Sequence, residues 1–167
     1  MKSLSRPQLD SLLQVARSHS ESDYLALLVG FNHGLRVSEI LSLSKENIVA
    51  GQLVIQRLKR SRKTTQPLLP SEKELLETLA QSGRPFFTIC RKTLWAHMKA
   101  YAVEAGIPSN VSPHWLKHSA GRLGYLGGMG IPEIGAYLGH KNLGNSLIYM
   151  QASEEEASKA FARAVGV

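Results

Sequence analysis

The chain has 167 residues, which is enough for one domain with a buried core. Its 20 lysines and arginines exceed its 13 acidic residues, giving a net charge of +7. This excess favours a polyanionic partner, because Lys and Arg gain affinity by displacing the counterions around phosphates. No apolar run approaches the roughly 20 residues that a membrane span needs, so we expect no membrane partner.

Cysteine usage and the N-terminal sequence indicate the compartment. Cys90 is the only cysteine, so no internal disulfide can form, and its neighbourhood holds no second thiolate for a zinc site. Residues 1–10 lack the apolar stretch of a secretory signal. We therefore expect a cytoplasmic protein without a bound metal.

The N-terminal part of the chain predicts three helices. Ser5, followed three residues later by Gln8, makes a capping box before apolar residues at helical spacing. A second helix is expected over residues 23–32 and is broken by Gly34. A third helix follows Arg36, which therefore stands at a helix start just after a glycine.

A β-hairpin with a cationic tip is expected next. Residues 53–55 and 64–69 contain good strand formers, and the polar run between them, residues 59–63, reads K-R-S-R-K. Pro67 and Pro70 indicate that the return strand is short or lies at a sheet edge.

The remaining residues predict further helices. Ser71 with Glu74 makes a second capping box, and Ser112 with Pro113 starts another helix. Helical patterns are also expected over residues 93–105, from Pro132 to Gly139, over residues 145–150, and from Ser153, capped by Glu156. We therefore expect a single mainly α (α+β) domain over residues 1–167 with a small antiparallel β-hairpin.

Four separated segments carry side chains suited to chemistry on a phosphate. They are residues 34–40 (G-L-R-V-S-E-I), the hairpin tip, residues 114–118 (H-W-L-K-H), and residues 138–140 (L-G-H) with a tyrosine nine residues further on. A tyrosine hydroxyl has a pKa of about 10, so its attack on phosphorus requires help with the proton. The charge that develops on the phosphate oxygens favours preorganised cations.

In order and spacing, these segments resemble the catalytic segments of the tyrosine recombinase (phage integrase) family, across roughly residues 4–160. The family pattern is an arginine in G-L-R-x-x-E, a lysine in a β-hairpin, H-x-x-R, L-G-H and a later tyrosine. The resemblance implies a site-specific DNA recombinase catalytic domain. Such an enzyme cuts and rejoins DNA through a 3′-phosphotyrosyl intermediate, with no metal, ATP or other cofactor.

The resemblance assigns Tyr149 as the nucleophile and Arg36 and Lys117 as the cations that hold the phosphate. At position 117 the sequence departs from the family, which usually has its second arginine there. Lysine keeps the positive charge but loses the planar fork that binds two phosphate oxygens at once. The departure therefore concerns how the phosphate is activated rather than which family the chain resembles.

The resemblance implies further catalytic roles. His140 is expected to donate a hydrogen bond to the phosphate, and His114 to assist proton transfer to or from the tyrosine. The departing 5′ oxygen needs a general acid, which a hairpin lysine supplies in the family. Spacing from Pro67 favours Lys59 for this role, and spacing from Pro70 leaves Lys63 as the alternative.

Other polar residues are expected to bind DNA or to support the site. The expected DNA-binding residues are Arg57, Arg60, Arg62, Lys63 and Lys141. Glu39 is expected to brace the segment of Arg36, and His118 to hold its neighbours by hydrogen bonds.

Double-stranded DNA with a recombination site is the expected partner, in a protein of bacterial or phage origin near the nucleoid. The last helix has an apolar stripe, Ala157, Phe161 and Val165, through which copies are expected to assemble on DNA. The alternative is that this stripe packs on its own domain. Because the pattern begins near Leu4, we expect the N-terminal clamp domain of such recombinases to be absent.

Two other functions remain open. One is a DNA-binding accessory protein or prophage remnant that keeps the fold and no longer cuts, which the lysine at position 117 would favour. The other is DNA relaxation like that of type IB topoisomerases, which share the chemistry.

Overall fold

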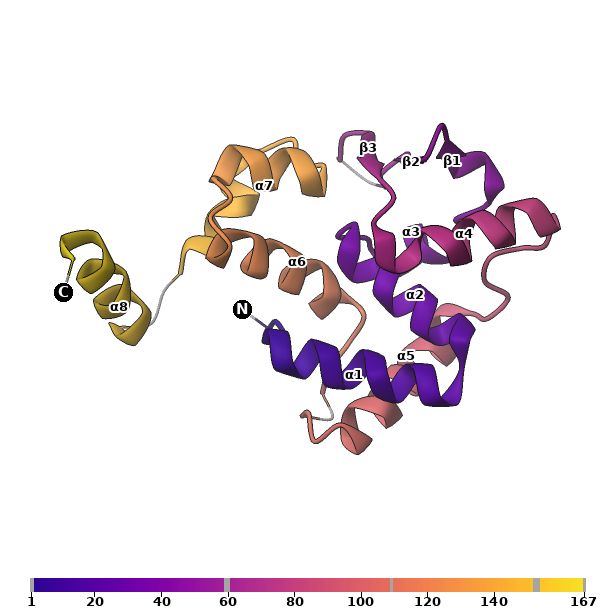
Figure 1. Ribbon diagram of the computed structural model, residues 1–167, viewed down its shortest axis with the longest axis horizontal. Coiled ribbons are helices and arrows are strands. Elements are labelled where there is room, and N and C mark those ends of the chain that lie inside the picture. Colours follow the sequence, from indigo (N-terminus) through magenta and orange to yellow (C-terminus); the bar gives the residue numbers. More distant parts are fainter. Residues whose placement is uncertain (1, 59–60, 109, 152–153, 167) are drawn as a thin grey trace.

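The computed structural model describes residues 2–58, 61–108, 110–151 and 154–166, and has the predicted mainly α (α+β) fold (Figure 1). The elements are α1 (Arg6–His19), α2 (Glu21–Asn32), α3 (Val37–Leu41), the 3-10 helix η1 (Lys45–Asn47), β1 (Ile48–Val49), β2 (Gln52–Ile55), β3 (Thr64–Pro67), α4 (Pro70–Ser82), α5 (Arg91–Glu104), α6 (His114–Leu126), α7 (Ile131–Leu138), the 3-10 helix η2 (Leu143–Met150) and α8 (Glu154–Val165). Among the described residues, no helix is long and apolar enough to cross a membrane.

The first two helices follow each other closely because each has a side-chain cap. The Ser5 hydroxyl accepts from the Gln8 amide at 3.4 Å, and the Gln8 side chain accepts from the Ser5 amide at 2.9 Å, which confirms the predicted capping box. Ser20 ends α1 and caps α2, where its hydroxyl accepts from the Asp23 amide at 3.1 Å.

The three strands form one antiparallel sheet in the order β1-β2-β3. The predicted hairpin is confirmed as β2 and β3, with Leu53 opposite Gln66. β3 lies at the sheet edge, as Pro67 indicated. β1 was not predicted; it turns into β2 through Ala50 and Gly51, whose φ angles of +50° and +73° suit a tight hairpin turn.

The start of α4 differs from the prediction. The helix begins at Pro70, and the Glu72 carboxylate accepts from the Leu69 amide at 3.1 Å. The predicted capping box of Ser71 and Glu74 is therefore wrong, because proline already occupies the first helical position and a carboxylate one residue beyond Ser71 caps the chain.

Two apolar clusters position the elements that matter for function. The larger cluster takes buried residues from α1 to α6 and from β2. The smaller one joins α7 and η2 through Ile134, Leu138 and Tyr149. Gly34, at φ +59°, allows Leu138 to approach closely, since a Cβ there would lie 2.1 Å from Leu138 Cδ2. The turn before α3 is thereby pressed against the end of α7.

α8 stands apart from the rest of the molecule (Figure 1). Two side chains of its predicted apolar stripe are exposed, Phe161 by 68% and Val165 by 51%. The stripe therefore does not pack on its own domain in this structure. Ser153, the predicted start of this helix, lies outside the described residues.

Candidate active site

A polar cleft of about 230 Å³ opens between the start of α3, the hairpin tip, α6 and η2. It is lined by Arg36, Ser61, His114, Lys117, His118, His140, Lys141, Asn145, Ile148 and Tyr149. Five of the six predicted catalytic residues meet in this cleft although more than a hundred positions separate the first from the last. The sixth, Lys59, lies outside the described residues.

Tyr149 lies in η2 with its ring packed on α6. The residue is 1% exposed, and a Cβ at Gly121 would lie 2.4 Å from Tyr149 Cζ, so glycine at this position leaves room for the ring. Burial raises the pKa of the Tyr149 hydroxyl to about 12. The hydroxyl therefore needs a base to become a nucleophile at neutral pH.

His118 is the histidine that contacts this hydroxyl. The Tyr149 hydroxyl oxygen lies 3.4 Å from His118 Nδ1. Burial, together with nearby His114 and Lys117, lowers the pKa of His118 to about 4, so its ring is neutral at pH 7 and able to accept a proton. His114 packs edge-on against His118 with ring centroids 4.3 Å apart. From the sequence, His118 was expected only to hold its neighbours by hydrogen bonds.

His140 is held by the turn that ends α7. Gly139 closes this helix at φ +73°, where a Cβ would lie 2.8 Å from the Arg62 carbonyl oxygen. The main chain of the hairpin tip pairs with the same turn. The Arg62 amide donates to the Gly139 carbonyl at 2.8 Å, and Ser61 forms an isolated antiparallel β-bridge with His140. His140 Nδ1 lies 2.7 Å from Ser146 Oγ. Burial, with the surrounding cations, lowers the pKa of His140 to about 4, so a neutral ring faces the cleft.

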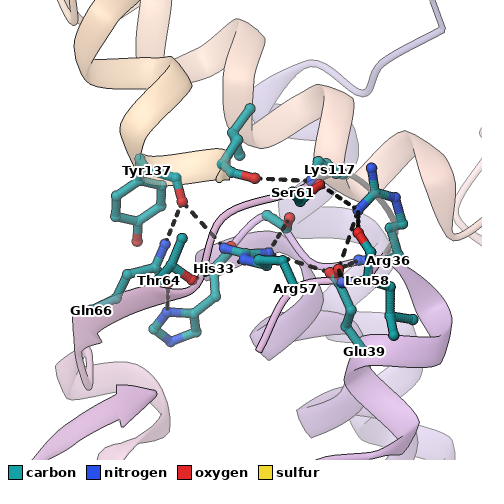
Figure 2. Close-up of polar contacts among 12 residues, drawn as sticks. His33, Arg36, Glu39, Arg57, Leu58, Ser61, Thr64, Gln66, Lys117 and Tyr137 are labelled. Atoms are coloured by element: carbon teal, nitrogen blue, oxygen red, sulfur yellow. Dashed lines mark hydrogen bonds and ion pairs between the residues drawn. The ribbon is translucent and has the colours of Figure 1, made fainter. Parts of the chain in front are cut away.

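Arg36 stands at the N-terminal end of α3, where Glu39 fixes it. Its Nη1 donates to Glu39 Oε1 and to Ser61 Oγ, both at 3.2 Å (Figure 2). The Glu39 carboxylate also accepts from the amides of Arg36 at 2.8 Å and Leu58 at 3.0 Å. Burial raises the pKa of Glu39, but these amides and the Arg57 guanidinium outweigh burial and keep the pKa below its usual value. Glu39 is therefore a carboxylate at pH 7.

Arg57 is buried, which contradicts its predicted role in DNA binding. The residue is 3% exposed, and Figure 2 shows its guanidinium among its hydrogen-bond partners. Its guanidinium donates to Thr64 Oγ1 at 2.8 Å, to Glu39 Oε2 at 3.3 Å, and to the carbonyl oxygens of Gly34 at 3.0 Å, His33 at 2.8 Å and Tyr137 at 3.2 Å. These acceptors belong to segments around the cleft, so the buried Arg57 side chain holds these segments together beneath the cleft. A side chain enclosed in this way does not reach a DNA backbone, and that prediction is wrong.

Lys117 lines the cleft from α6 with little access to solvent. The residue is 3% exposed, and its Nζ donates to the Leu138 carbonyl at 3.1 Å. Burial, with Arg57 and Arg36 nearby, lowers the pKa of Lys117 to about 7. At neutral pH the amine is therefore divided between its charged and neutral forms.

The other predicted cations lie at the surface. Lys141 is exposed on the rim of the cleft, and Arg62 and Lys63 are exposed at the hairpin. Arg60 lies outside the described residues, as Lys59 does. Over the described part of the chain, no group of three or more His, Cys, Asp or Glu side chains could hold a metal ion.

Three side chains that sequence reasoning missed complete the site. Ser61 contacts Arg36, and Ser146 contacts the ring of His140. Arg122 donates to the Tyr149 carbonyl at 2.8 Å. The spacing of Arg122, one helical turn after His118, was a signal that could have placed it on the same face of α6.

The fold and this cleft define a tyrosine recombinase catalytic domain. The chain is similar to the crystal structure of XerA recombinase, with a TM-score of 0.80 and 18% identity over 98% of this chain and 63% of that one. It is also similar to the catalytic domain of bacteriophage HP1 integrase, with a TM-score of 0.74 and 18% identity over 96% of this chain and 94% of that one.

The sequence comparisons identify the family. The pattern of the phage integrase family matches residues 2–156. Type 1 fimbriae regulatory protein FimB of Escherichia coli K12 is 31% identical over 169 residues, 87% of this chain and 82% of that protein. Tyrosine recombinase XerA of Pyrococcus furiosus is 31% identical over 98% of this chain, which spans only 62% of that relative. The chain belongs to the phage integrase family. The prediction of a site-specific tyrosine recombinase catalytic domain is confirmed, and the alternative of a non-cutting accessory protein is not favoured.

Proposed function

We propose that the chain cleaves and rejoins double-stranded DNA at a recombination site through a covalent bond to Tyr149. One observation carries the proposal: a single cleft holds a buried tyrosine, two cations from different elements, and neutral histidines. Such a set serves phosphoryl transfer, in which positioning and charge stabilisation do most of the catalytic work.

The proposed first step moves two protons, forms one bond to phosphorus and breaks another. The Tyr149 hydroxyl gives its proton to His118 Nδ1, 3.4 Å away, while the phenolic oxygen attacks the scissile phosphorus. The bond from phosphorus to the 5′ oxygen breaks, and that oxygen takes a proton from a hairpin lysine, Lys59 or Lys63. His114, edge-on to His118, belongs to the same proton route.

Three side chains are proposed to hold the phosphate. Arg36 keeps 28% of its side chain exposed while Glu39 orients it, so its fork can meet phosphate oxygens. Lys117 adds a second charge when protonated. The Ser146 hydroxyl is proposed to donate to His140 Nδ1, which places the ring proton on Nε2. His140 Nε2 then donates a hydrogen bond to a phosphate oxygen.

Rejoining is the reverse reaction. The phosphotyrosyl bond retains the energy of the cut strand, so a free 5′ hydroxyl can attack it and release Tyr149 without ATP. His118 then returns the proton to the phenolic oxygen, and the hairpin lysine takes one from the attacking hydroxyl.

Relatives solved with DNA support duplex DNA as the partner. XerH recombinase has been solved bound to its difH substrate, and lambda integrase as a dimer bound to a core site. In this chain, exposed Lys141, Arg62 and Lys63 lie beside the cleft and would contact the phosphate backbone. The exposed stripe of α8 supports assembly of copies on DNA through this helix.

Covalent capture from a DNA library of random sequence tests the proposal, whatever the recombination site is. The protein is mixed with nicked duplexes, made so that the short fragment carrying the newly freed 5′ hydroxyl diffuses away after cleavage. Adducts are then isolated under denaturing conditions and sequenced. We expect an enriched sequence joined to the protein, and mass spectrometry should place the bond on Tyr149.

Two variants make the test decisive. Tyr149→Phe should abolish the adduct while DNA binding persists, and Tyr24→Phe, a half-buried tyrosine on α2, should leave the adduct unchanged. An adduct that survives in Tyr149→Phe, or its absence from the wild-type protein across the bound part of the library, contradicts the proposal.

A further inference from the structure

Arg122 connects the proposed nucleophile to the C-terminal helix. It lies on α6, one turn after His118. Its Nη1 donates to the Tyr149 carbonyl at 2.8 Å. Its Nη2 meets both carboxylate oxygens of Glu156 on α8, at 2.7 Å and 2.6 Å. One planar guanidinium on α6 therefore binds both η2 and α8.

The same face of α6 holds Tyr149 at two further points. The ring lies against Gly121, where a Cβ would meet it at 2.4 Å, and the hydroxyl points to His118. The ring and hydroxyl are thus placed by contacts near the cleft, whereas the backbone of the same residue is held by Arg122. Since a side chain follows its backbone, the Arg122 contact helps set where the hydroxyl lies in the cleft.

We propose that Arg122 is a positioning residue that couples the placement of Tyr149 to the placement of α8 through Glu156. The proposal rests on the proposed role of Tyr149 as nucleophile. Arg122 does not touch the reacting atoms; it acts through the main chain of the residue that does.

Geometry and burial explain why arginine suits this role. The Arg122 side chain is only 12% exposed and that of Glu156 is 39% exposed, so water reaches the ion pair mainly from the side of the carboxylate. Two nitrogens of one rigid plane serve the two partners, so a shift of Glu156 tilts the plane and disturbs the bond to the Tyr149 carbonyl. A lysine at this position has one nitrogen and lacks the planar fork, so it cannot reproduce this paired geometry.

Through this coupling, the position of α8 affects DNA cleavage. α8 stands apart from the rest of the molecule and exposes Phe161 and Val165, so a second copy can contact it there (Figure 1). When α8 moves, Glu156 moves with it and Arg122 loses the carboxylate that orients it. Cleavage competence is thereby made to depend on the position of α8.

Four variants test the coupling: Arg122→Gln, Glu156→Gln, the double variant, and Glu155→Gln as the matched control. Glu155 is the adjacent carboxylate on α8, where it pairs with Lys159 on the same helix. The measurement is the single-turnover cleavage rate constant on the captured DNA at saturation, with the dissociation constant measured separately.

We expect Arg122→Gln to slow cleavage about 10- to 100-fold without changing DNA affinity, because small misplacements of a reacting group cost rates of this order. Glu156→Gln should slow cleavage about 3- to 10-fold, and the double variant should match Arg122→Gln, since Glu156 acts through Arg122. Glu155→Gln should cleave like the wild type. Effects of the two substitutions that multiply, or that fall on affinity alone, overturn the proposal.

A second readout does not depend on cleavage. Hydrogen exchange over residues 143–151 of the free protein should speed up in Arg122→Gln and, to a smaller extent, in Glu156→Gln, and should be unchanged in Glu155→Gln. Arg122→Lys checks that the loss follows the fork rather than the charge, and should also raise exchange there. If the wild type makes no adduct, the proposed function fails, and unchanged exchange in Arg122→Gln still overturns the positioning role separately.

Discussion

At the scale of single residues, Lys117 changes how this site responds to pH. The family pattern leads us to expect an arginine at this position, and an arginine stays charged at every pH that a protein tolerates. Lys117 is buried beside Arg57 and Arg36, and its pKa falls to about 7. The number of positive charges in the cleft therefore changes within the physiological range of pH.

Cleavage should decline as pH rises through 7. Protonated Lys117 stabilises the phosphate and the neutral amine does not, so the second-order rate constant should be nearly constant between about pH 5.5 and 7 and fall about tenfold per unit above pH 7. His118 and His140 stay neutral from about pH 5.5 upward, because their pKa values are about 4. At saturating DNA the decline should move to higher pH, since a bound phosphate stabilises the ammonium form.

Substitutions of Lys117 separate this decline from other titrations. Lys117→Arg should keep cleavage active and remove the decline between about pH 7 and 9. Lys117→Met should lower the rate at pH 7 by about 100- to 1000-fold. A decline that persists unchanged in Lys117→Arg would assign it to another group.

At the scale of elements, α3 is organised by one buried carboxylate. Glu39 is 1% exposed and joins the start of α3 to Leu58 and to the buried guanidinium of Arg57. The same carboxylate orients Arg36, the cation that faces the cleft. The packing around Arg57 and the placement of Arg36 therefore both depend on this residue.

Glu39→Gln should destabilise the fold by about 3–5 kcal/mol, because it leaves the charge of Arg57 buried without its carboxylate. Urea unfolding monitored by circular dichroism measures the loss. Glu46→Gln, an exposed carboxylate on η1, serves as the control and should change stability by less than about 0.5 kcal/mol. Equal stability of the two variants would show that the Glu39 charge is not needed.

Elements whose residues are close in sequence could be predicted. Gly139 ends α7 in the left-handed conformation that glycine favours; His140 follows at once, and Tyr149 lies in the next element, the 3-10 helix η2. The relative position of His140 and Tyr149 is therefore set mainly by the short segment between them, which is why their spacing in the sequence was enough to predict that they meet. Gly34 before Arg36 is a similar case, with a positive φ of +59°.

Contacts between distant segments could not be predicted. Arg57 looked like a surface cation on a hairpin, and only the fold brings the carbonyls of His33 and Tyr137 around it. Arg122 reaches Glu156, 34 residues further along the chain and on another helix, so no local spacing signals the pair. β1 has two residues, too few for any periodicity to show.

At the scale of the whole molecule, the cations behind the net charge of +7 differ in whether they are buried or exposed. The charged groups of Arg57 and Lys117 are buried in the protein. Those of Arg62, Lys63 and Lys141 are exposed at the surface near the cleft. Only cations that meet phosphates displace counterions when DNA binds, and the enclosed Arg57 does not, so the salt dependence of binding should report on the contacting cations and not on the total charge.

Lys141→Ala should weaken DNA binding equally across sequences and reduce the slope of log affinity against log salt by about 0.9. Fluorescence anisotropy between roughly 50 and 200 mM salt measures the slope. Lys73→Ala, an exposed lysine on α4, is the control and should leave the slope unchanged. Equal slopes for all three proteins would place Lys141 outside the DNA interface.

The pairing between the hairpin tip and the turn after α7 sets a rule for redesigning the DNA preference of this protein. Backbone atoms of Ser61 and Arg62 pair with Gly139 and His140, so the hairpin is also a support for the phosphate site. A hairpin transplanted from another recombinase must keep the same number of residues up to position 62. Apart from Ser61, which contacts Arg36, and the lysine proposed as general acid, the side chains of the tip can then be exchanged, because the pairing itself uses only the main chain.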